Sequence, residues 1–166
     1  MRSRVGLGFD VHPFSDDAAR RLVLAGVRVD GPGLAGHSDA DVIAHAVADA
    51  LLGAAGLPDL GTLFPASDER YRDASSMGLL DDVVRRVVKT GMWVGNVDVV
   101  VAAERPPLAA HLPAMSENLA AALAPAREPM GEPLRVSVKP KRTEGLGTIG
   151  RGEGIAAWAV ALLERA

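Results

Sequence analysis

Strand-like and helix-like hydrophobic patterns alternate twice along this chain of 166 residues, and this order restricts the possible folds more than any other feature. Alternating or continuous apolar runs indicate strands over residues 4–11, 93–103 and 134–140, and a short strand or ribbon over residues 20–29. Apolar side chains three and four residues apart indicate helices over residues 39–55, 75–91 and 107–125. The repeated strand–helix–strand order predicts an α/β (α+β) sandwich, in which a sheet carries helices on one face.

The last segment, residues 154–166, fits two structures. Its alanines and leucines favour a helix by intrinsic propensity. Both sets of alternating positions are apolar, however, which is also typical of a strand buried on both faces. Periodicity leaves the two alternatives open. Residues 56–75, which include Pro58 and Pro65, are expected to form mostly loop.

Composition limits the class of protein. The chain is 48% hydrophobic but only 4% aromatic, so its core must consist mainly of Val, Leu and Ala. No repeat and no linker divides it, and residues 1–166 are expected to form a single domain. The net charge of −3 argues against a nucleic-acid partner. Because we find no signal peptide and no membrane-spanning run, we expect a cytoplasmic protein without a membrane partner.

The stretch GFDVHPF, residues 8–14, contains the first candidate metal ligands. Residues two apart on a strand point to the same side, so Asp10 and His12 share one face. Because the chain has no cysteine, a zinc site must combine His with Asp or Glu. The alternative is a solvated surface at the end of a strand. Side chains of this stretch that we expect in the core are Phe9, Val11 and Phe14.

A third ligand lies on the helix expected at residues 39–55. Ser38 and Asp41 form a capping-box pattern, which places the helix start at Ser38. Asp41, His45 and Asp49 recur every four residues and therefore line one face. A histidine between two carboxylates has partners that can fix its tautomer. The alternative is a charged, solvated helix face.

The same region offers a place for an anion. His37 and Ser38 lie at the expected helix N-terminus, where free backbone N–H groups and the helix dipole favour a phosphate. Two separate segments thus provide ligands that suit zinc, and one of them also provides an anion site. This combination argues against two unrelated solvated surfaces.

Residues 139–154 are rich in glycine and charge. They contain a G-x-G-x-x-G pattern at 145–150, but the 16 residues that follow are too few for a dinucleotide-binding fold. A phosphate-binding loop is the better interpretation, because glycines let backbone N–H groups approach oxygens closely. Glu144 would repel a phosphate unless a hard cation bridges them, which points to Mg²⁺. A surface salt bridge of Glu144 with Lys141 or Arg142 is the alternative.

Four stretches together carry a resemblance to a known family, namely GFDVHPF and residues 36–65, 95–108 and 143–163. In order and spacing they resemble the 2-C-methyl-D-erythritol 2,4-cyclodiphosphate synthases of the non-mevalonate isoprenoid pathway, nearly from end to end. The resemblance implies a homotrimer with active sites between adjacent subunits. It also implies a mixed four-stranded sheet with outer helices, whose three copies face a central axis, and a strand over residues 154–163.

The activity that the resemblance implies is that of a phosphorus–oxygen lyase. The 2-phosphate of 4-diphosphocytidyl-2-C-methyl-D-erythritol 2-phosphate would attack the β-phosphorus, so that CMP leaves and the 2,4-cyclodiphosphate forms. Two like-charged phosphates must meet, so positioning and charge neutralisation should dominate. No general base is required, because the attacking phosphate is already ionised.

The match to the family also implies roles for individual residues. One zinc ion per subunit would bind Asp10, His12 and His45, and Mg²⁺ or Mn²⁺ would bind Glu144 and the substrate diphosphate. The implied catalytic residues are His37 and Arg142. Implied substrate contacts are Asp10, His12, His37 and Ser38 at the metal site; Asp59, Leu60, Gly61, Phe64, Pro65, Ala66, Ser67 and Asp68 around the methylerythritol; Ala103, Glu104, Arg105, Pro106, Pro107, Leu108 and Ala109 around cytosine; and Lys141, Arg142, Thr143, Glu144, Thr148 and Arg151 in the glycine-rich loop.

The chain departs from the family pattern at three positions. Arg142 stands where the family usually has a threonine credited with stabilising the β-phosphate, and Pro107 stands where a lysine is common. Thr148 replaces a common aromatic residue thought to face the central cavity of the trimer. Because an arginine can neutralise a phosphate, we expect Arg142 to take over the role of that threonine.

Two other functions remain as alternatives. A zinc-dependent nucleotide diphosphate hydrolase would need water at the fourth zinc position and would release a linear product. A non-catalytic trimer would bind CDP without turnover.

Overall fold

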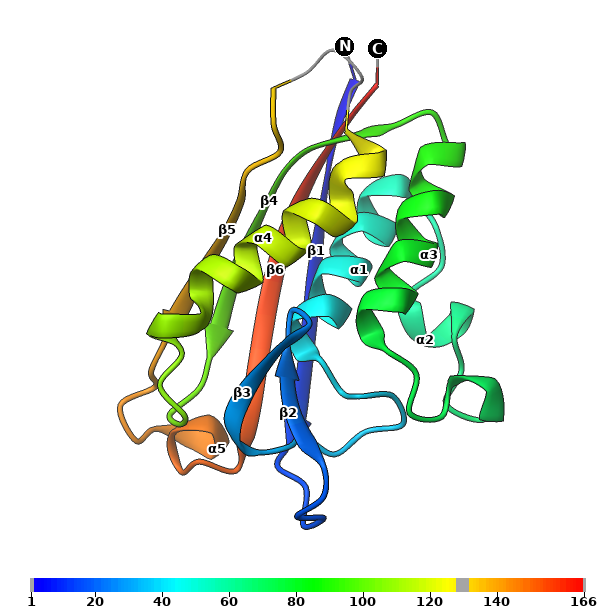
Figure 1. Ribbon diagram of the computed structural model, residues 1–166. Coiled ribbons are helices and arrows are strands. Elements are labelled where there is room, and N and C mark those ends of the chain that lie inside the picture. The colour runs from blue at the N-terminus through cyan, green and yellow to red at the C-terminus, as the bar shows by residue number, and fades with distance from the viewer. Residues whose placement is uncertain (1, 128–131, 166) are drawn as a thin grey trace.

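The computed structural model describes residues 2–127 and 132–165, which form one mixed sheet with helices on one face (Figure 1). The strand order is β1–β6–β4–β5, with β4 and β5 parallel and the other neighbours antiparallel. The strands are β1 (Arg2–Pro13), β4 (Trp93–Ala102), β5 (Val136–Lys141) and β6 (Gly154–Arg165). The expected four-stranded sheet is confirmed, and the last segment is a strand, as the family resemblance implied.

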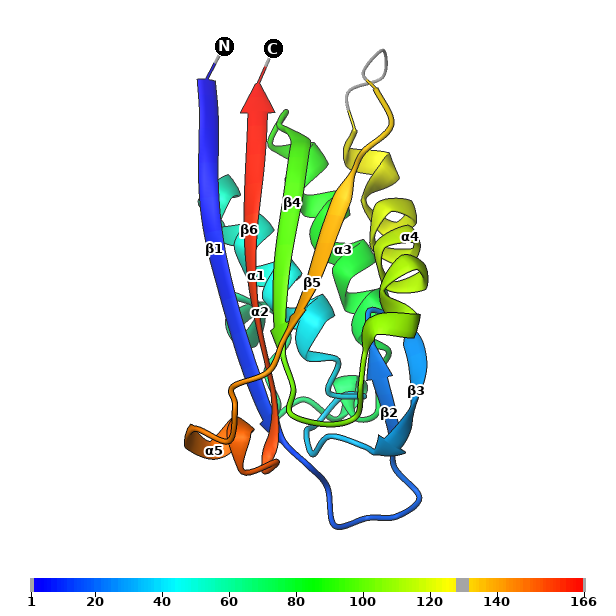
Figure 2. The same ribbon diagram turned by 90° about the vertical axis from the view of Figure 1, so that its left-hand side faces the viewer.

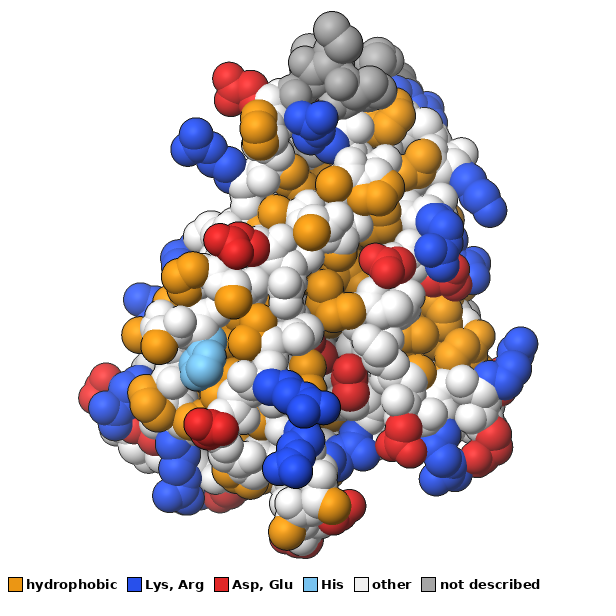
Figure 3. Space-filling view, in the orientation of Figure 1, with side chains coloured by type: hydrophobic (Ala, Val, Ile, Leu, Met, Phe, Trp, Pro, Cys, Tyr) orange, Lys and Arg blue, Asp and Glu red, His pale blue; other side chains and the backbone are white. Residues whose placement is uncertain are grey.

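Three helices cover one face of the sheet, and the opposite face lies open toward the viewer in Figure 2. They are α1 (Val42–Ala55), α3 (Ser76–Lys89) and α4 (Leu112–Leu123). The smaller elements are the ribbon of β2 (Arg21–Leu24) and β3 (Val27–Pro32) and the short helices α2 (Leu60–Leu63) and α5 (Gly147–Gly150). On the helical side, apolar groups show in the grooves between the helices and charged side chains surround them (Figure 3). None of the described helices has the length and apolar character that crossing a membrane requires.

Two glycines let α1 approach β1 closely. A Cβ atom at Gly8 would lie 1.9 Å from the carbonyl oxygen of Ala46, and Gly6 meets the next turn of the helix in the same way. Because no side chain fits in that space, only glycine permits this distance between helix and strand. Asp10 and His12 are the next two residues on the same side of β1. The close packing therefore brings α1 over both of them.

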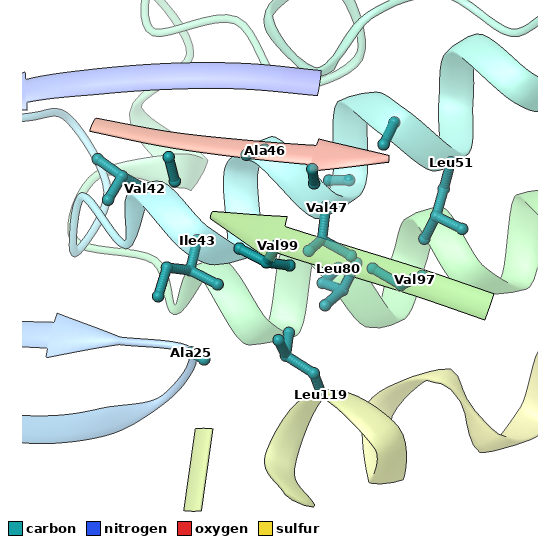
Figure 4. Packing of buried hydrophobic residues seen from close by; sticks show 14 of the residues in the cluster. Ala25, Val42, Ile43, Ala46, Val47, Leu51, Leu80, Val97, Val99 and Leu119 are labelled. Atoms are coloured by element: carbon teal, nitrogen blue, oxygen red, sulfur yellow. The ribbon is translucent and has the colours of Figure 1, made fainter. Parts of the chain in front are cut away.

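The core lies between the sheet and the helices, and it is mostly aliphatic, as the composition predicts. Figure 4 shows side chains from α1, α3, α4 and β4 that point toward one another. Six of them are at most 1% exposed: Val47, Leu51, Leu80, Leu119, Val97 and Val99.

The open face of the sheet carries exposed apolar side chains on β1 and β6. Phe9 and Val11 are 48% and 46% exposed, so the expectation that they belong to the core is wrong. The alternation of β1 turns them away from α1, whereas Phe14 packs against the core as expected. Phe9 contacts Trp158 of β6, with 5.1 Å between the ring centroids. We call this surface the open apolar face; its members are Val5, Leu7, Phe9, Val11, Trp158 and Val160.

Helix α1 begins at Val42, so the expected start at Ser38 is wrong. Asp41 is the N-cap, and its Oδ1 accepts the backbone N–H groups of Ile43 and Ala44 at 3.1 and 3.0 Å. These donors are therefore occupied by a side chain of the protein. The helix N-terminus no longer explains an anion at His37 and Ser38, and another cause is needed.

Candidate functional site

Asp10 and His12 of β1 and His45 of α1 converge on one point. Asp10 Oδ2 lies 3.3 Å from His12 Nε2 and 2.9 Å from His45 Nδ1. The three ligand atoms all lie within 4.8 Å of one another. In a tetrahedral zinc site with bonds of about 2.0–2.1 Å, ligand atoms are about 3.3 Å apart. The predicted triad is thus assembled, and its donor set and spacing fit a four-coordinate cation such as zinc.

The electrostatics of the triad also favour a cation. Burial alone would raise the pKa of Asp10, but its hydrogen bonds with His12 and His45 hold that pKa well below its usual value. The hydrogen bond with Asp10 raises the pKa of His12, although burial opposes it. The carboxylate therefore stays ionised and attracts positive charge to this point.

In each histidine, the ring nitrogen that points away from Asp10 has a hydrogen-bond partner. The nitrogen that faces Asp10 is therefore free to bind a metal. His12 Nδ1 donates to the backbone oxygen of Ala35 at 2.6 Å, so Nε2 faces Asp10. His45 Nε2 lies 2.8 Å from Ser76 Oγ and 3.2 Å from Ser38 Oγ. Histidine ligands of metals usually donate their other N–H in this way.

The partners expected for His45 on its own helix are wrong. Asp41 is fully buried as the N-cap, and Asp49 accepts the backbone N–H of Leu60 at 2.8 Å. The side chains that bond to the imidazole come from other segments instead. The four-residue spacing places Asp41 and Asp49 near the face of α1 that carries His45. Both carboxylates, however, accept hydrogen bonds from backbone N–H groups instead of contacting the imidazole.

A cavity of about 290 Å³ opens beside the triad. Apolar groups from α2 and the loop after it form one wall, and the triad with the segment before α1 forms the other. The predicted site residues that line it are Asp10, His12, His37, Ser38, His45, Leu60, Gly61, Phe64 and Ala66. Asp59 instead caps α2, and Asp68 pairs with Arg70 at 2.6 Å.

Arg20 holds the segment that carries His37 and Ser38. Its guanidinium donates to the backbone oxygens of Leu34, at 2.5 Å, and Gly36, at 2.9 Å, and also to that of Ser38. Three carbonyl groups are thereby turned toward Arg20. This clamp replaces the helix N-terminus as the reason why the two side chains face the cavity.

A second cavity, of about 460 Å³, lies beyond the end of β4. It brings together most of the residues implied for cytosine with the start of the glycine-rich loop. The predicted residues that line it are Ala103, Glu104, Pro106, Pro107, Leu108, Ala109, Lys141 and Arg142, joined by Pro140.

Arg142 pairs with Glu104 across this second cavity. Its Nη2 lies 2.5 Å from Glu104 Oε1, and Glu104 Oε2 accepts the N–H of Thr143 at 3.2 Å. The guanidinium holds the pKa of Glu104 below its usual value. The alternative salt bridge to Glu144 is therefore not the one that Arg142 forms.

The backbone of the glycine-rich loop is not extended at Glu144. Glu144 has a φ of +53°, so Arg142 and Glu144 do not share the face of a strand. The hydroxyl of Thr143 is buried and has no hydrogen-bond partner among the described residues. Thr148 is exposed on α5, and Arg151 pairs with Glu153 at 2.5 Å.

The two cavities lie at the same end of the sheet but at opposite edges. In the strand register, His12 of β1 pairs with Ile155, and Ala102 of β4 lies between Ala156 and Lys141. Neighbouring strands are about 4.8 Å apart, so three intervals separate the edges by about 14 Å. Within one chain the triad and the second cavity are therefore apart.

Sequence reasoning missed several residues of the site. Ser76 bonds to His45 from 31 positions away, Ala35 acts through its backbone, and Arg20 acts on backbone oxygens. Tyr71 and Leu79 complete the wall of the first cavity. No spacing rule links any of these to the metal motif, because each contact depends on how loops and helices pack.

Known proteins resemble this chain over nearly its whole length. The model of the YgbB family matches residues 3–164. A 2-C-methyl-D-erythritol 2,4-cyclodiphosphate synthase of Rubrobacter xylanophilus is 59% identical over 165 residues, covering 98% of this chain and 96% of that protein. A protein of the same name from Geobacter sulfurreducens is 48% identical and covers 97% of this chain and 98% of its own length.

Solved structures agree with these relatives. The bifunctional IspDF of Campylobacter jejuni superposes with a TM-score of 0.89 at 40% identity, covering 99% of this chain and 43% of that one. A CDP complex of IspF from Plasmodium falciparum superposes with a TM-score of 0.81 at 32% identity, covering 98% and 96%. The resemblance expected from the motifs is confirmed: the chain belongs to the YgbB family, which includes the 2-C-methyl-D-erythritol 2,4-cyclodiphosphate synthases.

Proposed function

We propose that this chain converts 4-diphosphocytidyl-2-C-methyl-D-erythritol 2-phosphate to 2-C-methyl-D-erythritol 2,4-cyclodiphosphate and releases CMP, in isoprenoid precursor biosynthesis. The observation that carries the proposal is the assembled triad of Asp10, His12 and His45 beside His37 and Ser38, in a chain whose relatives are named for this activity. The reaction is an intramolecular phosphoryl transfer, so the chain acts as a phosphorus–oxygen lyase.

The cations are part of this proposal. Zinc, one ion per subunit, would be held by Asp10, His12 and His45, and it would supply charge neutralisation to a phosphate oxygen. Mg²⁺ or Mn²⁺ would be held by Glu144 together with the substrate, because Mg²⁺ commonly combines one carboxylate with phosphates. The exposed carboxylate of Glu144 suits this role, since Arg142 pairs with Glu104.

The protein groups around the triad position the attacking phosphate. His37 and Ser38 face the first cavity and can donate hydrogen bonds to phosphate oxygens. Arg20 fixes their backbone, so they need not reorganise when the substrate binds. Leu60 and Phe64 provide an apolar wall for the methylerythritol carbons. The segment 103–109 would hold cytosine, mainly through backbone groups.

The proposed active form is a homotrimer with active sites between adjacent subunits. The open apolar face needs a cover, because a sheet surface with Phe, Trp, Leu and Val side chains is unusual in contact with water. A neighbouring copy that placed its second cavity beside the triad would also complete the site. The sheet between the two cavities is two to three strand spacings wide, or about 10–14 Å, and this separation motivates the arrangement.

Phosphorus NMR tests the proposed reaction directly. Incubation of the protein with the diphosphocytidyl substrate, Zn²⁺ and Mg²⁺ should give CMP and a cyclic diphosphate in equal amounts. Linear methylerythritol diphosphate would instead support a zinc-dependent nucleotide diphosphate hydrolase. Binding of CDP without any product would support a non-catalytic trimer.

A further inference from the structure

We propose that Ser76 and Asp39 are positioning residues that hold the imidazole of His45 in the tautomer whose Nδ1 can bind a metal. This inference rests on the proposed zinc site, and it assigns a role to two residues outside the ligands and the substrate contacts. Ser76 is the first residue of α3, and Asp39 lies in the segment before α1. A third element thus takes part in the metal centre.

The contacts form a chain from Asp39 to the triad. Ser76 Oγ contacts Asp39 Oδ1 on one side and lies 2.8 Å from His45 Nε2 on the other. His45 Nδ1 then lies 2.9 Å from Asp10 Oδ2. The side chain of His45 is 13% exposed and Ser76 is 1% exposed, so little water competes for these hydrogen bonds.

The direction of each hydrogen bond follows from the chemistry of the groups. An ionised carboxylate only accepts, so the hydroxyl proton of Ser76 points to Asp39. The oxygen of Ser76 is then left to accept a proton from His45 Nε2. A neutral imidazole with its proton on Nε2 has a lone pair on Nδ1, on the side of Asp10 and His12.

Asp39 is itself fixed in place. Both of its carboxylate oxygens lie 3.2 Å from the backbone nitrogen of Ser76, at the start of α3. Its own N–H donates to the carbonyl of Ala74 at 3.0 Å. The carboxylate therefore cannot easily turn away from the serine hydroxyl.

Ser38 is the competing partner of His45, and its contacts are weaker. Its Oγ lies 3.2 Å from His45 Nε2 and 3.3 Å from Ser76 Oγ, and it accepts the N–H of Ala40 at 3.2 Å. Ser38 also lines the first cavity, where substrate would engage its hydroxyl. The shorter contact with His45 and the hydrogen bond to the partly buried carboxylate of Asp39 assign the positioning role to Ser76.

Zinc affinity of the whole protein, measured by competition with a chelator, tests the inference. Loss of an outer hydrogen-bond partner typically weakens metal binding by about 10–100-fold, and we expect Ser76→Ala to fall in that range. Ser75→Ala is the matched control, because this exposed neighbour caps α3 and does not touch His45. Asp39→Asn keeps the shape of the side chain but makes it a weaker acceptor for the hydroxyl of Ser76. This variant should lose less zinc affinity than Ser76→Ala.

Spectroscopy of the imidazoles separates positioning from general destabilisation. In zinc-loaded protein with ¹⁵N-labelled histidine, His45 should carry its proton on Nε2 and His12 on Nδ1. In Ser76→Ala the His45 Nε2–H signal should broaden by exchange with water, while that of His12 stays as an internal reference. A folded Ser76→Ala protein that keeps both signals would overturn the inference.

The outcomes distinguish this inference from the proposed metal site. If the unaltered protein fails to bind zinc stoichiometrically, the site and the inference both fall. If it binds zinc and neither Ser76→Ala nor Asp39→Asn weakens that binding, only the positioning role falls. A larger loss in Ser38→Ala than in Ser76→Ala would also overturn the assignment.

Discussion

His45 is the residue on which the metal centre depends most, because it brings α1 to the two ligands of β1. We expect His45→Ala to lose most of its zinc and to slow turnover by about 100-fold or more, while the fold persists. Metal analysis, circular dichroism and the CMP assay on the same sample provide the measurement. His111→Ala, which removes a histidine at the start of α4, should change neither metal content nor turnover. Full zinc occupancy in His45→Ala would contradict the ligand assignment.

The neighbouring positions 142 and 143 compete for the phosphate role. Arg142 was predicted to act there, but it pairs with Glu104 and is 67% exposed, whereas the buried hydroxyl of Thr143 has no hydrogen-bond partner in the described part of the chain. If Arg142 turns to the β-phosphate when substrate binds, Arg142→Ala should lose roughly 10²–10³ in turnover, as for an oxyanion donor. Turnover of Arg142→Ala and Thr143→Ala, measured side by side, decides which residue has the phosphate role. Near-normal turnover of Arg142→Ala with collapse of Thr143→Ala would transfer the role to Thr143.

Local patterns predicted the ligands better than their surroundings. Asp10 and His12 were found because a strand has a period of two, and His45 because its helix carries polar residues in register. Ser76 could not be found, because its contact depends on where α3 starts relative to α1. The hydroxyl of a serine also carries no pattern that separates a metal partner from an ordinary helix cap.

At the scale of the elements, the approach of α1 to β1 is the contact that sets the site. In Gly8→Ala the new Cβ would meet the carbonyl of Ala46 at 1.9 Å, so helix and strand must move apart. Overpacking of this kind typically costs about 1–3 kcal/mol, and here it should weaken zinc binding as well. Gly78→Ala in α3 meets only a side-chain atom at 3.8 Å and should stabilise the helix by about 0.5–1 kcal/mol. Chemical unfolding of both variants measures the difference, and equal effects would contradict the close packing.

The N-cap of α1 makes stability depend on pH. Burial raises the pKa of Asp41 to about 6, although hydrogen bonds from Ala44 and Gly26 favour the ionised form. Between the unfolded value of 3.8 and about 6, the folded state binds more protons than the unfolded one. The contribution of Asp41 to the free energy of unfolding therefore falls as pH rises through this window, by on the order of 2–3 kcal/mol.

Asp41→Asn isolates this contribution. The amide oxygen can still cap Ile43 and Ala44, but the NH₂ group faces the N–H of Gly26, so the variant should be less stable. Its deficit relative to the unaltered protein should be largest near pH 4 and should shrink toward pH 6–7. Urea unfolding at fixed protein concentration from pH 4 to 7 gives both curves. Parallel curves would show that Asp41 does not titrate in this range.

The order of the elements was predictable from the sequence. The presence of β1 was predictable too, but not which of its sides faces the helices. The large apolar residues of β1, namely Val5, Leu7, Phe9 and Val11, all lie on one side of the strand, and a hydrophobic pattern alone suggests that a helix covers that side rather than the other. Gly6 and Gly8 indicate the side that the helix covers, because small residues on a strand allow a helix to approach closely. Phe9 and Val11 looked like core for the opposite reason: large apolar side chains are buried in most monomers. Their exposure is consistent with the proposed trimer, in which another copy of the chain would cover them.

For the whole molecule, the open apolar face predicts that the isolated chain associates. We expect light scattering at micromolar concentration to give the mass of a trimer, about three times 17.2 kDa. Trp158→Glu should lower that mass, because the change buries a charge at the interface while the helix-covered core is untouched. A monomeric mass for the unaltered chain would contradict the proposed assembly.

Mixed trimers test whether one subunit supplies the metal triad and its neighbour the glycine-rich loop. His45→Ala removes a triad ligand, and Glu144→Ala removes the proposed Mg²⁺ ligand from the loop, so each pure trimer should be inactive. If every active site lies between subunits, a site in a random equal mixture works only when its triad comes from the Glu144→Ala chain and its loop from the His45→Ala chain. That combination occurs at about one interface in four, so co-expressed subunits should recover about a quarter of the unaltered turnover. If triad and loop of the same chain form the site, every site carries one of the two defects and mixing restores nothing. Turnover that stays at the level of the separate variants, in trimers shown by mass spectrometry to be mixed, would rule out the shared site.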